Sequence, residues 1–196
     1  MLPMKSIFFL LLTILLLTSC GIAKPLQHKP KKIDSLPLKL ALFLDGTANN
    51  EKTNTNVFKL YNLVSLQKNP NIIAQYQRGV GNGADIFGKV MGSGIKREVC
   101  KAYLYIAENY QHQRNDEIYI FGFSRGAYTS RVLAGFIFTV GIVDIQKIPK
   151  EKRLKYIKKI FTSHKGKNKT MQQRRDAVFK ITQQKINPSV YKIKFM

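Results

Sequence analysis

One serine stands between two glycines in a pattern that suits nucleophilic chemistry. Gly122, Ser124 and Gly126 form a Gly-X-Ser-X-Gly motif that follows an apolar run and opens a segment with helical character. In that context the serine lies on a sharp strand-to-helix turn, where larger neighbours would collide with strand and helix. The motif therefore predicts Ser124 as a nucleophile. A serine that caps a buried helix is the alternative, but it would not need glycine on both sides.

An oxyanion formed by attack of Ser124 needs hydrogen-bond donors. The helix N-terminus supplies a favourable dipole, and the backbone N–H of Arg125 is the first candidate donor. The second donor normally comes from a loop after an earlier strand. Gly46 and Thr47 follow Asp45 at the end of an apolar run, so we expect them to form this oxyanion region.

A serine hydroxyl also needs a base, and the base needs an acid that orients it. On an α/β-hydrolase scaffold the acid and then the histidine follow the serine in the chain. Three acids follow Ser124, namely Asp144, Glu151 and Asp176, but the only later histidine is His164. His164 is thus the candidate base, although its lysine-rich surroundings fit a solvated loop histidine better. His28 and His112 precede the serine and are weaker candidates.

Apolar runs alternate with helical patterns along the chain. We expect strands at 38–44, 72–77, 117–123 and 190–195. Between and after them, helices are expected near 57–64, with Asn54 or Asn56 as cap, at about 95–110, and from Ser124 to Gly141. Such alternation predicts a three-layer α/β fold with a parallel sheet. Cys100 adjoins the apolar stripe of the 95–110 helix and is expected to be buried.

Two further motifs were weighed as alternatives. Asp45-Gly46-Thr47 resembles a phosphatase signature, but the nucleophilic aspartate would fall at Phe43. The glycines from 79 to 83 formally fit a dinucleotide fingerprint, yet no helix opens directly behind them and no ribose-binding acid is evident. We read the segment from 78 to 94 as a flexible loop. No cofactor or metal is expected.

The N-terminus has the pattern of a bacterial lipoprotein signal. Lys5 precedes an apolar run from Ile7 to Leu17, which is too short to span a bilayer comfortably. The last residue of the run opens the sequence Leu-Thr-Ser-Cys, which ends at Cys20. We expect a signal peptide over 1–19, an acylated, palmitate-bearing Cys20, a tether over 20–36 and one domain over 37–196. A buried N-terminal helix or a plain anchor helix is the alternative.

The charge of the chain bears on its partners. There are 33 Lys and Arg against 11 Asp and Glu, a net charge of +22, and 147–185 is especially basic, with one amphipathic helix and part of a second. Such a surface attracts anionic lipid or nucleic acid. Export would exclude nucleic acid as a partner. It would favour membrane lipids, which the chain would contact through its acyl anchor and its basic surface. We expect attachment to the outer membrane, facing the periplasm.

Three segments together resemble the α/β-hydrolase domain family of the type VI secretion phospholipase effectors. They are "LFLDGTANN", "QRGVG" and "DEIYIFGFSRGAYTSRVLAGFI", and the likeness covers roughly 38–145. The resemblance implies Ser124 as an esterase nucleophile and phospholipids or related esters as substrates.

In that family the acid follows a later strand and the histidine comes later still, and residues 190–195 look like the strand before that acid. We therefore expect a sheet that is incomplete at its C-terminal side, and little activity. A non-catalytic, basic, membrane-attached lipoprotein on a hydrolase-like scaffold is the alternative.

Overall fold

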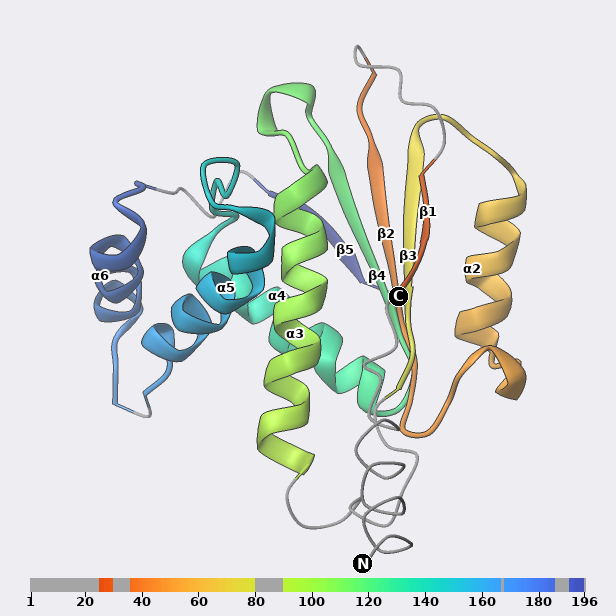
Figure 1. Cartoon of the computed structure of the whole chain (residues 1–196), viewed down its shortest axis with the longest axis horizontal. Helices are drawn as coiled ribbons and strands as arrows, with labels where there is room; N and C mark the ends of the chain where they lie inside the picture. The colour runs from red at the N-terminus through yellow and green to blue at the C-terminus, as the bar shows by residue number, and fades with distance from the viewer. Residues whose placement is uncertain (1–24, 30–35, 80–89, 167, 186–190, 196) are drawn as a thin grey trace, which may run out of the picture.

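The structure is a computed structural model that describes residues 25–29, 36–79, 90–166, 168–185 and 191–195. A five-stranded sheet in the order β1-β3-β2-β4-β5 forms its centre (Figure 1). The strands are β1 Leu26–His28, β2 Lys39–Leu44, β3 Ile72–Gln77, β4 Glu117–Gly122 and β5 Lys192–Phe195. The four strands β2 to β5 confirm the predicted strand positions and the α/β-hydrolase-like parallel sheet.

β2 lies in the middle of the sheet because it is apolar on both faces. It pairs in parallel with β3 on one side and with β4 on the other, and β5 adds in parallel to β4. The register places Leu44, Gln77 and Gly122 side by side at the carboxyl edge. Loops that follow these three strands must therefore meet at one edge of the sheet.

Helices cover both faces of the sheet, which gives the predicted three layers (Figure 1). α2 Asn56–Leu66 packs on one face, where Phe43, Tyr61 and Tyr76 share an aromatic cluster. α3 Val90–Asn109 and α4 Arg125–Val140 pack on the other face, over the larger core. Cys100 is fully buried there, as predicted from its place beside the helical stripe.

The predicted tether is wrong in one part. Residues 26–28 form β1, which pairs antiparallel with β3 at the edge of the sheet. Leu26 packs against the aromatic cluster on the α2 face, and Gln27 Nε2 donates to Gln75 Oε1 at 2.9 Å. The strand thus covers an otherwise open sheet edge. The signal peptide and Cys20 lie outside the described residues.

Two helix starts differ from the prediction. α2 is capped by Thr55, whose Oγ1 accepts the N–H of Phe58 at 3.2 Å, and not by Asn54 or Asn56. Asn54 instead adopts a left-handed conformation with φ of 50°. α3 begins at Val90, so the last glycines of the predicted loop, Gly92 and Gly94, are helical.

The basic C-terminal region forms the two predicted helices. α5 Lys150–His164 packs on α3, and α6 Met171–Thr182 packs on α5 and α4. Arg153 is buried on α5, where its guanidinium contacts the Ile148 carbonyl at 2.9 Å and Glu108 at 3.2 Å. In the part of the chain that the structure describes, no helix has the length and apolar character needed to cross a membrane.

Candidate active site

Ser124 lies on a strained turn between β4 and α4. Its backbone has φ of 52° and ψ of −120°, a combination rarely adopted by residues other than glycine. Such a conformation costs about 1–3 kcal/mol and persists only where the surroundings impose it. The side chain is exposed, and it makes no hydrogen bond that caps the helix. The alternative of a helix-capping serine therefore does not fit the geometry.

The two motif glycines allow this turn because there is no room for a side chain at either position. A Cβ on Gly126 would lie 2.0 Å from the carbonyl oxygen of Leu44, at the end of β2. A Cβ on Gly122 would lie 2.5 Å from Ser130 Oγ and 2.7 Å from the Ala127 backbone. The start of α4 is thus pressed directly onto the ends of β2 and β4.

The loop after β2 lies against Ser124, as the sequence predicted. A Cβ on Gly46 would be 3.1 Å from Ser124 Cβ and from the Phe123 ring. Gly79, after β3, packs so closely on this loop that its Cβ would overlap the Gly46 carbonyl oxygen and lie 3.1 Å from Thr47 N. Three loops from three adjacent strands therefore converge on the serine.

Asp45 holds this loop in place. Its carboxylate is buried and accepts hydrogen bonds from Gly46 N at 2.8 Å, Thr55 Oγ1 at 2.6 Å and Tyr76 OH at 2.8 Å, with Asn49 Nδ2 at 3.2 Å. Burial, followed by this bond to Asp45, raises the pKa of Tyr76 far above its ordinary value. Asp45 is therefore a structural anchor of the loop.

The two expected oxyanion donors of this loop differ. The N–H of Gly46 is engaged by Asp45 Oδ1, so it does not face the serine as a donor. The N–H of Thr47 has no acceptor among the described residues. Within the predicted oxyanion region, Thr47 is the better donor candidate, together with Arg125 at the first position of α4.

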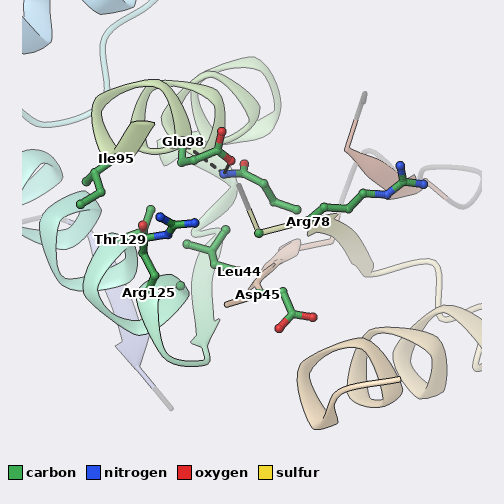
Figure 2. Close-up of a pocket in the computed structure, with 10 residues that line it drawn as sticks. Leu44, Asp45, Arg78, Ile95, Glu98, Arg125 and Thr129 are labelled. Atoms are coloured by element: carbon green, nitrogen blue, oxygen red, sulfur yellow. Dashed lines mark hydrogen bonds between the residues drawn. The ribbon is translucent and has the colours of Figure 1, made fainter. Parts of the chain in front are cut away.

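A narrow pocket opens between the ends of β2 and β3 and the helices α3 and α4 (Figure 2). Arg125, Glu98 and Thr129 line its helical side, whereas the Asp45 carboxylate points away from Arg125. Glu98 Oε2 accepts from Gln77 Nε2 at 2.5 Å, and both side chains are buried. The pocket carries polar groups beside the serine turn without holding a histidine.

None of the three histidines lies near Ser124. His164 is the last residue of α5, with its ring centroid 4.7 Å from that of Phe136. Phe136 lies twelve residues after Ser124 along α4, about 18 Å at the helical rise. His28, in β1, is separated from β4 by two strands, and His112 precedes β4 at the opposite end of that strand.

His164 is therefore not placed to act as the base for Ser124, and it is not a solvated loop residue either. Burial between Phe136 and Phe161 lowers its pKa to about 4, and neighbouring Arg174, Lys165 and Lys169 add to this effect. Its Nδ1 lies 2.7 Å from the Phe161 carbonyl oxygen. The three later acids do not line the pocket beside Ser124.

The Asp45 anchor and the Gln77–Glu98 pair were not predicted. The sequence contained a signal for the Gln77–Glu98 pair, because Gln75 and Gln77 are polar residues in an otherwise apolar, buried strand. Among the described residues, no group of His, Cys, Asp and Glu side chains is arranged to hold a metal ion.

A comparison of the chain with models of protein families gives a match. The model of the type VI secretion phospholipase effector Tle1-like catalytic domain matches residues 39–196. The chain belongs to this family. The match begins at β2 and includes the Asp45 loop, the Ser124 turn and the basic helices.

One curated relative is similar to part of the chain. It is an uncharacterized protein of Saccharomyces cerevisiae, 32% identical over an alignment of 134 residues that covers 59% of this chain and 19% of the relative. The chain thus spans about a fifth of that relative's length. No solved structure matches.

Proposed function

We propose that this chain provides the nucleophile of a serine hydrolase that acts on lipid esters, with Ser124 as the attacking residue. The observation that carries the proposal is the Ser124 turn, with its exposed serine, its left-handed φ of 52° and the loop of Gly46 and Thr47 packed against it. A helix N-terminus without chemistry has no need of this strain. Membership of a phospholipase effector family supports the same reaction class.

In this reaction Ser124 Oγ attacks the ester carbonyl while its proton passes to a base. The carbonyl oxygen becomes an oxyanion, to which the N–H groups of Thr47 and Arg125 donate. Collapse of the intermediate releases the alcohol, protonated by the same base, and leaves an acyl-serine that water then hydrolyses.

No histidine among the described residues lies beside Ser124, since all three histidines lie elsewhere in the fold. We propose that a polypeptide segment outside the described arrangement supplies acid and base. The chain alone then retains only oxyanion stabilisation and binding, which in serine proteases amounts to about 10³–10⁴ over water. We expect little or no measurable turnover.

Two exposed aromatic residues favour an apolar substrate. Phe123 directly precedes Ser124 and Tyr128 lies one helical turn after it, and 53% and 57% of their surfaces are accessible to solvent. Large side chains left open beside a nucleophile are suited to contact with an acyl chain. This supports a lipid ester over a polar ester as substrate.

The test is hydrolysis of a short-chain nitrophenyl ester and of a phospholipid by the full chain, with Ser124→Ala and His164→Ala as comparisons. We expect all three proteins to show the same low residual rate, with no difference between the wild type and either variant. Robust activity that both substitutions abolish would contradict the inferred placement of the base. Activity lost only in Ser124→Ala would show that a group other than His164 serves as base.

A second candidate function rests on the same absence of a histidine beside Ser124. In that case the chain is a non-catalytic lipoprotein, acylated at Cys20, held at the outer membrane and facing the periplasm. Metabolic labelling with a fatty acid tests the anchor: wild type should be labelled and Cys20→Ala should not. Equal labelling of both would remove the lipoprotein proposal and leave the hydrolase proposal untouched.

A further inference from the structure

One aromatic residue near the end of α4 and one on α6 are exposed to solvent. Phe138 on α4 and Phe179 on α6 leave 59% and 39% of their surfaces exposed. Arg175 Nε donates to the carbonyl of Thr139 at 3.3 Å and so joins the two helices. Between them lies a hollow of about 350 Å³, with an apolar floor that includes Val140 and Val178.

Cations accompany Phe179 around this hollow. Arg175 and Lys185 line the hollow, and Lys180 is exposed next to Phe179. The acid in the lining, Asp176, accepts a hydrogen bond from Gln172 at 2.8 Å. We define the α4–α6 surface as Phe138, Phe179 and these three cations.

The wider region has the same sign of charge. Between Lys147 and Lys185 the sequence has only two acids, Glu151 and Asp176, whereas Lys and Arg occur in almost every helical turn. On α5 the side chains of Lys152, Lys155 and Lys159 are exposed, so the charge is presented to solvent. Any partner of this region must therefore be strongly anionic.

We propose that the α4–α6 surface contacts an anionic lipid bilayer. Aromatic rings are stabilised at the membrane interface, and the lysine and arginine stems extend their charged ends to the headgroups. Each cation near an anionic surface strengthens attachment by roughly fivefold. The inference rests on this surface alone and does not depend on the chemistry of Ser124.

The outer face of α2 is the natural comparison. Leu63 and Leu66 there are 59% and 74% exposed, more than the α4–α6 aromatics. However, α2 contains a single cation, Lys59, and no aromatic residue that is exposed. It also covers the opposite face of the sheet from α4 (Figure 1). If apolar exposure alone directed membrane contact, α2 would be the contacting face.

The chain has no tryptophan, so a single introduced tryptophan reports on one position. The full chain would be reconstituted with vesicles of phosphatidylcholine alone, or mixed with phosphatidylglycerol, each containing brominated lipid as quencher. The reporter variants are Phe138→Trp and Phe179→Trp, and the control is Leu66→Trp. All three variants have the same N-terminus, so any attachment through it is equal and differences in quenching reflect surface contact.

In anionic vesicles we expect several-fold stronger quenching at positions 138 and 179 than at 66. In neutral vesicles, or with Lys180→Glu and Lys185→Glu added to each reporter, the quenching should fall to the level of Leu66→Trp. Lys59→Glu is the matched charge control and should have no effect.

Three results would overturn the proposal. The first is equal or stronger quenching at position 66, and the second is quenching that does not depend on the anionic lipid. The third is a change in the fluorescence spectrum of Phe179→Trp without vesicles. If this change depends on protein concentration, a second copy of the chain covers the surface. If an oligonucleotide produces a change as large as that produced by anionic vesicles, the surface binds polyanions in general.

Discussion

A methyl group at Gly126 should destabilise the fold more than its size suggests. This glycine is the second residue of α4, and its Cβ would lie 2.0 Å from the Leu44 carbonyl oxygen and 2.5 Å from the carbonyl carbon. Ordinary contact begins at 3.4 Å, so the helix would have to withdraw by about 1.4 Å. Both groups belong to the backbone, and no side-chain rotation relieves the collision.

The expected cost follows from overpacking, at about 1–3 kcal/mol and occasionally more. Gly135, in the same helix, provides the matched control, because a Cβ there meets nothing within 4 Å. Alanine is favoured over glycine in a helix interior by about 0.5–1 kcal/mol, so Gly135→Ala should be stabilising. The two variants should thus differ by at least about 1.5 kcal/mol in the free energy of unfolding.

Thermal and urea unfolding of the full chain in a mild detergent measures this difference. For a chain of this size the midpoint temperatures should differ by at least about 3 °C, with Gly126→Ala the lower. If Gly126→Ala were as stable as Gly135→Ala, α4 would not be pressed against β2. The argument that packing imposes the Ser124 turn would then fail.

Three further predictions concern buried groups. His164 has a pKa lowered from 6.5 to about 4 by burial, so the unfolded chain binds more protons between these values. The free energy of unfolding should therefore fall as the pH drops below about 6.5, and less steeply in His164→Asn, as measured by urea titration. Arg114→Ala leaves the buried Asp116 carboxylate without its ion pair at 2.6 Å, and unfolding should show a loss of about 3–5 kcal/mol. Cys100 is fully buried and burial raises its pKa to about 11, so mass spectrometry should find it unmodified by iodoacetamide until urea is added.

The sheet and the serine turn could be predicted because their signals are local. β2 is apolar on both faces and can only be a central strand, and the spacing of Gly122, Ser124 and Gly126 places a strand end next to a helix start. The position of Gly46 beside Ser124 then follows, since adjacent parallel strands bring their carboxyl ends to one edge.

Features that depend on partners far along the chain were not predictable in the same way. β1 is three residues long and exists because the outer edge of β3 accepts it, which no pattern in the tether reveals. His164 has hydrophilic neighbours in sequence, yet the helix carries it into contact with Phe136 on another element. The sequence does not single out Thr55 as the cap, because Asn54 and Asn56 beside it are at least as good as capping residues.

The serine turn and a base for Ser124 depend on different parts of the fold, so the turn can be intact although no histidine lies beside it among the described residues. The turn is built from the ends of β2, β3 and β4, whose pairing is continuous and whose loops interlock at Gly46, Gly79 and Gly126. On this scaffold a base comes from later elements. Of those that the structure describes after α4, α5 and α6 contact its C-terminal half at Phe136 and Thr139, and β5 pairs with β4. Strain at Ser124 is therefore maintained by the core of the sheet whether or not catalysis occurs.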